Sequence, residues 1–462
     1  MPSKYVKWII PLTMLCLAAP AGAQNIFRGM PSTADGYSTY DADMINVENV
    51  SQTGAGVYVA VLDTGLAPNW KDYFPAARVA EKLGKGFVQS VSFKAHKDDC
   101  GFGITVGGMR ETTFVGSRGS EHGTHVTSTI LGFFYRSNFD AVQGFTIPPI
   151  MVRGIAPNVT VIPVKVLADY QVPQLPKCDD PDISTASQLV VFGTDAMVAA
   201  GINYVTDLAI AGYRPMVINM SLGGGALDPV EQAAIDRAIA NGVVIVASAG
   251  NSGNAGMGYP GAYAPVISVA AAGWNNAWVD PAVTQIYRMF WLQNGGDFVP
   301  PLFAGGGDVP EPTPTASGIL NNAAYIANFS SRELAGQQLD VAAPGVWVRG
   351  PFAGFPGYSH LPWWSSGIGD LMGRNPGNFY YVSGTSMAAP HVTAAAALML
   401  EKNPSLSQAQ VESILKSTAL SIPAGFGGDF QITAGFSNIQ VWGTDATGSG
   451  LIQVDAAIAA TP

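Results

Sequence analysis

The most informative stretch of this chain is Ser383-Gly384-Thr385-Ser386-Met387-Ala388-Ala389-Pro390-His391. Its small residues predict a tight glycine turn followed by a helix, and we expect Pro390 in the first helical turn, where proline is tolerated. A serine at that point exposes its hydroxyl above the positive end of a helix. Alone, the stretch is equally typical of a helix N-cap followed by a closely packed helix. The surrounding sequence therefore has to distinguish a structural turn from a reactive serine.

Two earlier stretches place an acid and a histidine at the edges of regular elements. The apolar, β-branched run Val57–Leu62 predicts a short strand and leads directly into Asp63. An open parallel sheet carries its functional groups at the carboxyl ends of its strands. Further on, Ser120-Glu-His122-Gly-Thr-His-Val opens a predicted helix. Asp, His and Ser placed in this way can supply the orienting group, the base and the nucleophile of acyl transfer.

Together the three blocks resemble the signature motifs of the subtilisin-like serine proteases, which carry Asp, His and Ser in this order. The resemblance extends from about Gly54 to about Ala457 and includes Ile218–Gly224, Val246–Asn251, Gly258–Pro260 and Ala343–Gly345. It implies a three-layer α/β/α fold with a mostly parallel central sheet. It also implies a serine endopeptidase that hydrolyses peptide bonds through an acyl-enzyme.

The resemblance assigns roles to individual residues. Ser386 would attack the peptide carbonyl, His122 would carry the proton, and Asp63 would orient the imidazole. Asn251 would stabilise the oxyanion together with the Ser386 backbone N–H, although Asn after Gly is also a common turn residue. His125, one turn beyond His122, has an expected packing or hydrogen-bonding role.

The same resemblance assigns a set of small, uncharged residues to substrate binding: Ser221, Leu222, Gly223, Gly224, Ala249, Gly250 and Gly258. Exposed peptide groups with little side-chain bulk can pair with a substrate backbone. A glycine-rich turn between a strand and a helix would have a similar sequence. If the residues do line a pocket, we expect broad specificity or a preference for apolar or aromatic side chains before the cut.

The middle of the chain has a βαβ rhythm. We predict helices near 123–134, 187–211 and 229–241, and strands at 159–167, 216–220 and 243–247. Strands that are apolar throughout, separated by amphipathic helices, indicate a parallel sheet covered on both faces. Near the end, 405–416 predicts a surface helix capped by Ser405 or Ser407.

Residues 1–23 have the pattern of a cleaved secretory signal. Lys4 and Lys7 precede an apolar run, Trp8–Ala19, and Ala-Gly-Ala follows. The run is too short to span a bilayer as an ordinary helix. We therefore predict a signal peptide, 1–23, and one peptidase domain, 24–462, in a secreted or periplasmic protein without a membrane anchor. A short buried N-terminal helix is the alternative.

Charge and composition narrow the class of partner. The chain has 462 residues and a net charge of −10, which becomes −12 when Lys4 and Lys7 are removed with the signal. An acidic chain without a basic run repels phosphate, which argues against nucleic acid. We expect a monomer that acts on protein or peptide substrates.

Two cysteines, Cys100 and Cys178, follow the predicted signal. In an oxidising compartment we expect a disulfide between them, with two separate thiols as the alternative. The chemistry needs no cofactor. Structural calcium is an open alternative, because acidic clusters can bind it or can be solvated loops: Asp98, Asp99, Asp179, Asp180 and Asp182. The stretch Tyr135–Arg153 lacks the Asn-rich loop that binds calcium in many relatives, so no metal ligand is assigned.

Two long stretches depart from the family pattern, 273–324 and 350–377, and both are rich in glycine, proline and aromatic residues. They could cover the cleft as a lid or substrate platform, or they could pack on the body of the domain. The segment 24–62 is too short for the folding-assisting pro-domain of many relatives. We expect folding to proceed unaided or with help from another chain.

Other activities fit parts of the sequence. An aspartic protease needs two Asp-Thr-Gly or Asp-Ser-Gly motifs, and this chain has one, at Asp63. A secreted binding protein on a protease scaffold could use the aromatic stretches. An esterase or peptide ligase would share the acyl-enzyme, since nucleophiles other than water can attack it.

Overall fold

The computed structural model describes residues 36, 38–95, 102–117, 120–135, 150–172, 188–274, 313–314, 320–321, 324–352, 379–428, 430–431, 436–437 and 440–462. All of them belong to one compact unit, Ser32–Pro462. Several predictions fall outside these residues: the signal peptide, the cysteines, the acidic clusters and most of both aromatic stretches.

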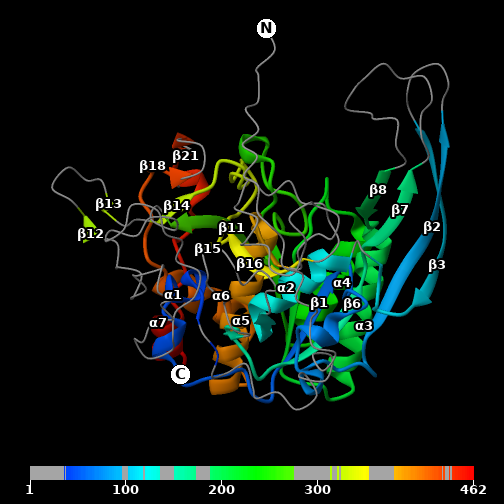
Figure 1. The fold of residues 1–462 in the computed structure, drawn as a ribbon, viewed down its shortest axis with the longest axis horizontal. Helices are drawn as coiled ribbons and strands as arrows, with labels where there is room; N and C mark the ends of the chain where they lie inside the picture. Colours follow the sequence, from blue (N-terminus) through cyan, green and yellow to red (C-terminus); the bar gives the residue numbers. More distant parts are fainter. Residues whose placement is uncertain are drawn as a thin grey trace, which may run out of the picture. The chain divides into compact units, whose positions relative to one another are not determined.

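A nine-stranded sheet forms the centre of this unit (Figure 1). Its order is β14-β11-β10-β9-β1-β6-β2-β3, and β15 also pairs with β11. The strands are β1 (Tyr58–Asp63), β2 (Lys85–Ala95), β3 (Phe102–Thr112), β6 (Thr160–Lys165), β9 (Met216–Met220), β10 (Val243–Ser248), β11 (Ile267–Trp274), β14 (Ala324–Ile326) and β15 (Val341–Pro344). Only β3 and β14, at the two ends of this order, pair antiparallel. The predicted mostly parallel sheet is confirmed.

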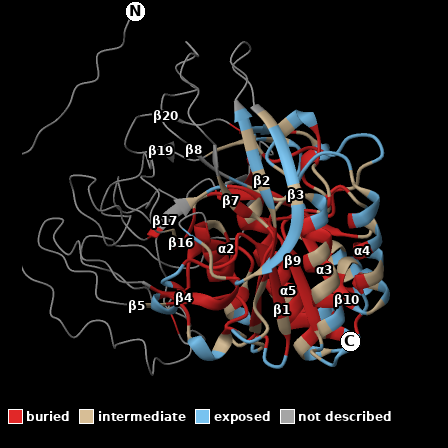
Figure 2. Cartoon of the chain, turned by 90° about the vertical axis from the view of Figure 1, so that its right-hand side faces the viewer, coloured by how far each residue is buried: buried red, intermediate tan, exposed pale blue. Residues whose placement is uncertain are grey.

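Helices cover both faces of the sheet, because the side chains of each strand alternate between two cores. In β1, Val59 and Val61 join one apolar cluster, and Ala60 and Leu62 join the other. The first cluster contains the inner faces of α2 (Glu121–Leu131) and α5 (Thr385–Lys402), and the second those of α3 (Asp195–Ile210) and α4 (Pro229–Ala240). Figure 2 shows the buried centre and the exposed β2–β3 hairpin. The three-layer prediction is therefore confirmed.

Shorter elements surround these layers. The helices are α1 (Tyr40–Asp43), α6 (Gln408–Thr418) and α7 (Val454–Ala460), with single 3₁₀ turns at Val47–Asn49, Trp70–Asp72, Ala76–Arg78, Gly253–Ala255 and Thr444–Ala446. The antiparallel pairs are β4 (Gly132–Tyr135) with β5 (Ile150–Arg153), β7 (Ala168–Val172) with β8 (Gln188–Phe192), β12 (Thr313–Pro314) with β13 (Leu320–Asn321), β16 (Val348–Pro351) with β17 (Phe379–Val382), β18 (Gly425–Gly427) with β21 (Gln440–Trp442), and β19 (Phe430–Gln431) with β20 (Phe436–Ser437).

Two predicted helices have different bounds. The first ends at Leu131, since Gly132 has a φ of 78° and begins strand β4. The second is a strand, β8, followed by α3, whose cap is Thr194. The β-branched Val190 and Val191 favour the strand. The surface helix is confirmed as α6, with Ser407 rather than Ser405 as its cap.

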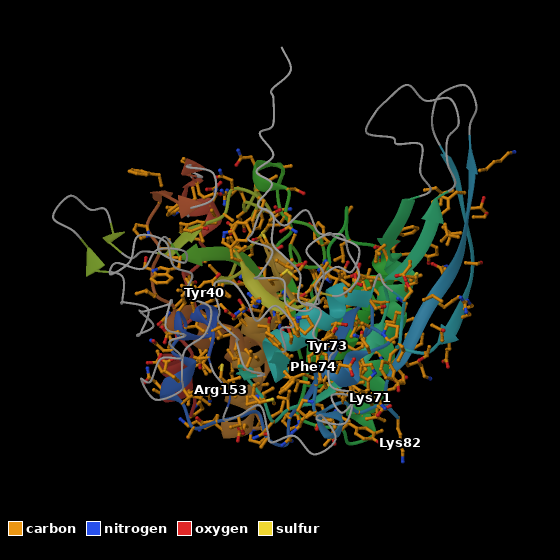
Figure 3. The ribbon with its side chains drawn as sticks, viewed as in Figure 1. Tyr40, Lys71, Tyr73, Phe74, Lys82 and Arg153 are labelled. Atoms are coloured by element: carbon orange, nitrogen blue, oxygen red, sulfur yellow. The ribbon has the colours of Figure 1, made fainter. Side chains whose placement is uncertain are left out.

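The described ends of the aromatic stretches pack on the body of the unit. Trp274 is 1% exposed and stacks on Tyr40 with ring centroids 6.3 Å apart. Phe379, where the chain returns after the second stretch, packs on Tyr73 at 5.7 Å. Figure 3 shows Tyr73 within the body, while exposed Lys82 points away from it. The other aromatic residues of 273–324 and 350–377 lie outside the described residues, apart from Phe352.

No helix in the described part of the chain has the length and apolar character needed to cross a membrane. Within the same residues, no group of three or more histidine, cysteine or acidic side chains could hold a metal ion.

Candidate active site

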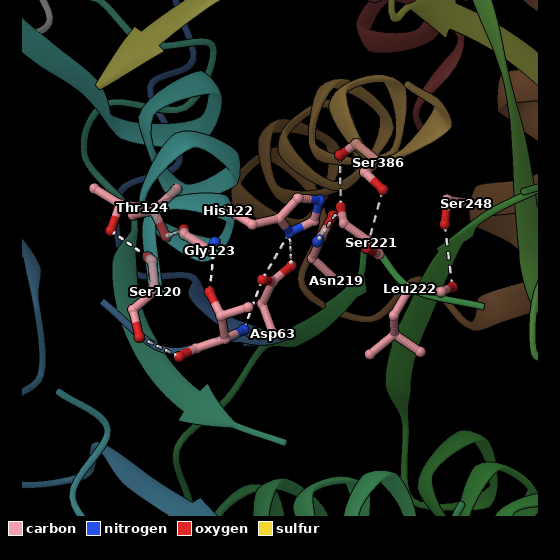
Figure 4. Close-up of polar contacts among 12 residues, drawn as sticks. Asp63, Ser120, His122, Gly123, Thr124, Asn219, Ser221, Leu222, Ser248 and Ser386 are labelled. Atoms are coloured by element: carbon pink, nitrogen blue, oxygen red, sulfur yellow. Dashed lines mark hydrogen bonds and ion pairs between the residues drawn. The ribbon is translucent and has the colours of Figure 1, made fainter. Parts of the chain in front are cut away.

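Three neighbouring strands bring the predicted site residues to one edge of the sheet. Asp63 is the last residue of β1, Ser221 follows β9, and Asn251 follows β10. These strands are adjacent and parallel, so their carboxyl ends meet. The helices α2 and α5 begin at the same edge and supply His122 and Ser386. Figure 4 shows Asp63, His122, Ser221 and Ser386 close together.

Asp63 holds one side of the His122 imidazole. Nδ1 of His122 lies 2.8 Å and 3.0 Å from the two carboxylate oxygens of Asp63. The Asp63 side chain is fully buried, whereas 30% of the His122 side chain is exposed. A carboxylate facing Nδ1 favours a proton on that nitrogen. Nε2 is then left as the proton acceptor.

The surroundings of His122 act in opposite directions on its pKa. Burial lowers the pKa, because it disfavours the charged imidazolium, while the charge and hydrogen bond of Asp63 raise it. The interactions with Asp63 outweigh burial, so the pKa of His122 lies above its usual value. The imidazole is thereby a stronger base.

Thr64 ties the end of β1 to the start of α2. Its carbonyl accepts hydrogen bonds from the Ser120 hydroxyl at 2.7 Å and from Lys165 Nζ at 2.8 Å. Its own hydroxyl oxygen accepts from the Gly123 N–H at 2.9 Å. Burial lowers the pKa of Lys165, despite nearby Asp169 and Asp63. These bonds fix the position of Asp63 relative to His122. The sequence reasoning missed Lys165, which looks like the ordinary polar end of a strand.

Ser386 lies in the first turn of α5, after the extended Gly384. Its hydroxyl donates to the Ser221 carbonyl at 3.1 Å. In Figure 4 the His122 ring lies between Asp63 and Ser386, although no hydrogen bond joins His122 to Ser386 among the described residues. Catalytic hydrogen bonds are often long without substrate and shorten when it binds.

The prediction that Pro390 lies in the first helical turn is wrong, because Pro390 lies one turn further along α5. A proline has no N–H, so the Ser386 carbonyl lacks its helical partner four residues on. The Ser221 hydroxyl donates to that carbonyl instead, at 2.7 Å. Asn219 Nδ2 in turn donates to Ser221 Oγ at 2.9 Å. Ser221 and Ser386 therefore hold each other through two reciprocal hydrogen bonds.

Asn251 presents its amide N–H₂ to the space beside Ser386. Its Oδ1 accepts from the Thr385 N–H at 2.9 Å and from the Thr385 hydroxyl at 3.0 Å. Because a backbone N–H can only donate, these bonds fix which end of the amide is oxygen. A Cβ placed on Gly384 would lie 3.6 Å from Asn251 Nδ2 and 3.7 Å from the Ser386 N. The two nitrogen atoms therefore lie at similar distances from one point beside Gly384.

A cleft of about 420 Å³ adjoins His122. Four of the seven predicted substrate-binding residues line it, the run Ser221–Gly224, whereas Ala249, Gly250 and Gly258 do not. Gly258 lies behind this run, where an added Cβ would be 3.1 Å from the Gly224 carbonyl oxygen. The Gly224 N–H donates to the Tyr259 carbonyl at 2.8 Å. The structure therefore places four of the seven residues in the cleft wall and Gly258 against that wall.

The subtilase family's sequence profile matches residues 54–443, most of the chain. The chain belongs to the subtilase family. This subtilase is therefore a serine protease, a hydrolase whose substrates are proteins or peptides. Subtilisin DY of Bacillus licheniformis is 28% identical over 423 residues, which are 90% of this chain and 98% of that protein. Subtilisin of Bacillus pumilus is 28% identical over 84% of this chain and 91% of its own length.

Among solved structures, Sphericase shares the fold of this subtilase. It superimposes with a TM-score of 0.51 and 24% sequence identity, over 90% of this chain and 98% of that chain. At this identity the likeness supports the architecture alone.

The remaining histidines near the site have structural contacts. His125 Nε2 lies 3.1 Å from the Val348 carbonyl oxygen, which agrees with the role expected for it. His391 Nε2 lies 3.0 Å from Asp41 Oδ2, so it joins α5 to α1. Three carboxylates that line the cleft were missed from the sequence: Glu121, Asp195 and Glu231. In the sequence they look like ordinary acidic residues in the first turns of helices.

Proposed function

We propose that this subtilase is a secreted or periplasmic endopeptidase in which Asp63, His122 and Ser386 act as the catalytic triad. The observation that carries the proposal is the pair of contacts between His122 Nδ1 and the Asp63 carboxylate, 2.8 and 3.0 Å. It leaves Nε2 as the base on the side of Ser386. The resemblance of the three motifs to those of subtilisins supports the same roles.

The proposed reaction proceeds in two steps. Ser386 Oγ attacks the peptide carbonyl while His122 Nε2 takes its proton, and the negative charge develops on the carbonyl oxygen. Asn251 Nδ2 and the Ser386 N–H donate to this oxyanion. His122 then gives the proton to the leaving amine, which departs and leaves an acyl-enzyme. Water then gives a proton to His122 as its oxygen attacks the acyl carbonyl. The ester bond to Ser386 Oγ breaks, His122 returns the proton to Oγ, and the product leaves as the carboxylic acid.

The test is labelling with a fluorophosphonate, followed by mass spectrometry of the modified peptide. We expect an adduct on Ser386 that is lost in Ser386→Ala and strongly reduced in His122→Ala. The Asp236→Asn variant is the control, because Asp236 is exposed on α4 and does not line the cleft. A folded wild-type protein without an adduct would contradict the proposal and favour the binding-protein alternative.

Specificity at the residue before the cut belongs to the same proposal. The run Ser221–Gly224 and Gly258 offer neutral, mostly small groups, which support a preference for apolar or aromatic side chains. A peptide library with each amino acid at that position measures it. Fast cleavage after Lys or Arg would contradict it.

Export and the predicted disulfide can be tested together. The pattern of residues 1–23 supports removal of a signal peptide and passage to an oxidising compartment. N-terminal sequencing of protein recovered outside the cytoplasm should begin near Gln24. Alkylation before and after reduction should differ by two cysteines if Cys100 and Cys178 are bonded.

A further inference from the structure

The cleft beside His122 contains a carboxyl group that the proposed chemistry does not use. Glu231 lies at the third position of α4, and only 3% of the residue is exposed. It lines the cleft together with Asp195, the first residue of α3, which is exposed. The recess thus has a buried acid and a second, solvent-accessible acid.

The position of Glu231 does not result from helix capping. A glutamate or glutamine at this position often reaches back to the N-cap backbone, as Gln410 does in α6. In α4 the N-cap is Asp228, whose side chain accepts from the Val230 N–H at 2.8 Å. Glu231 instead lies beside Asp195 of α3, whose charge acts on it. Its Oε1 is buried and has no hydrogen-bond partner among the residues that the structure describes.

The environment makes this carboxyl group costly to ionise in the absence of a ligand. Burial raises the pKa of Glu231 to about 7, and the neighbouring carboxylates Asp195 and Asp228 add to the effect. A buried acceptor without a partner is itself unfavourable. A cation in the recess would relieve both penalties.

The walls of the recess fit a long aliphatic stem. Apolar side chains line the same cleft as the two acids: Leu167, Val191, Phe192, Val198, Leu222 and Phe352. A lysine or arginine side chain has an apolar stem and a charged end. The stem can pack on the apolar walls, and the charged end can pair with the two acids. A metal ion matches them less well, because the described residues include no group of three side chains with metal-binding geometry.

We propose that Glu231 and Asp195 form a subsite that binds a lysine or arginine side chain of the substrate. Only four of the seven residues predicted for the residue directly before the cut, the run Ser221–Gly224, line this cleft, and Ala249, Gly250 and Gly258 do not. We therefore assign the subsite to another substrate position. The proposal rests on the proposed function, because it assumes that a peptide runs from Ser386 along Ser221–Gly224.

The test compares peptides that carry lysine or its neutral isostere norleucine at each position in turn on both sides of the cut. The measured quantity is the ratio of kcat/KM for the lysine peptide to that for the norleucine peptide. We expect a ratio of about ten at one position, because a charge-assisted hydrogen bond to a buried carboxylate is strong. The ratio should fall to near one in Glu231→Gln and decrease in Asp195→Asn.

Asp236→Asn is the matched control. It removes one negative charge from the same helix, but Asp236 is exposed and does not line the cleft. It should leave the ratio unchanged, which excludes a general effect of the acidic surface. Asp195→Lys, a change at an exposed position, should turn the preference toward glutamate at the same substrate position.

The pH dependence adds a second readout. The ratio should rise as pH increases through about 7, because Glu231 gains its charge there. The other titratable groups that line the cleft are Asp195, Glu121, His122 and Tyr259, and Asp228 at the N-cap of α4 also acts on Glu231. The protonation of His122 changes both rates alike, so it cancels in the ratio.

The outcomes separate the two proposals. If fluorophosphonate labels Ser386 but the ratio is one at every position, or is the same in Glu231→Gln, the subsite is overturned and the proposed function stands. If Ser386 is not labelled, the proposed function fails. In that case, tighter binding of the lysine peptide than the norleucine peptide by fluorescence anisotropy, lost in Glu231→Gln, would support the recess as a cation site. Equal binding would overturn it.

Discussion

Asp63 and Glu231 are both buried carboxyl groups beside the same cleft, but their surroundings differ. Asp63 accepts from the Thr64 N–H at 2.6 Å and contacts His122 through both oxygens. Glu231 has another acid, Asp195, as its neighbour and one oxygen without a partner among the described residues. Burial is therefore not what distinguishes them. The partners of a buried carboxylate determine whether it orients another group or is left to bind a ligand.

The largest expected difference between the two carboxylates is in catalysis. Asp63→Asn should lower kcat by about 10⁴-fold, because an amide facing Nδ1 favours the tautomer that cannot take the Ser386 proton. Glu231→Gln should leave kcat on a peptide without basic residues within about twofold. Steady-state kinetics on one neutral peptide measures both. Equal losses in the two variants would mean that Glu231 also belongs to the catalytic machinery.

Substitutions at Asn251 test the proposed oxyanion site, which involves neither of the two carboxylates. In subtilisin, loss of one such donor lowers turnover about 10²–10³-fold, and we take that magnitude for this chain. Asn251→Asp keeps an oxygen for Thr385 but replaces the donor with a negative charge, whereas Asn251→Ala removes both. We expect kcat to fall at least this much in both variants, with little change in KM. If Asn251→Asp keeps wild-type kcat, Asn251 is only a turn residue.

Glu231 should also make the free energy of unfolding depend on pH. The folded-state pKa of Glu231, about 7, lies above its usual value of 4.5, so the native state binds the proton more tightly than the unfolded state. Stability is then lost as pH rises from about 4.5 to about 7, by about 3 kcal/mol. Glu231→Gln in a Ser386→Ala background, which prevents self-digestion, should remove this loss. Denaturant unfolding at pH 5 and pH 8 measures it, with Asp236→Asn as control. An unchanged pH dependence would show that Glu231 is not destabilised by its neighbours.

The smallest expected effect concerns the acid limb of the activity profile. Because Asp63 raises the pKa of His122, kcat/KM on a neutral peptide should fall with a midpoint above pH 6.5 as pH decreases. The same midpoint is expected in Glu231→Gln, since Asp63 is the charged group that acts on His122. A shifted midpoint in that variant would mean that both carboxylates influence the same proton.

Much of the fold follows from local sequence. The continuous apolar runs at β1, β9 and β10 predict buried parallel strands, and the strand ends predict where Asp63, Ser221 and Asn251 lie. The predicted helix bounds are less accurate where a glycine or β-branched residues interrupt the helical pattern. Gly132 ends α2 because of its positive φ, and Val190 and Val191 form a strand where a helix was predicted.

The sequence by itself identified the residues with chemical function, because acid, base and nucleophile each require a particular side chain in a recognisable local setting. It did not reveal which groups the fold would bring together or leave without a partner. Tertiary structure decided that the Ser386 carbonyl, freed by Pro390, would accept from Ser221. It also decided that the first turns of α3 and α4 would bring Asp195 to Glu231, because both helices begin at the carboxyl edge of the sheet and pack side by side. A carboxyl group's surroundings depend on residues distant in the chain, and those contacts exist only once the layers have packed.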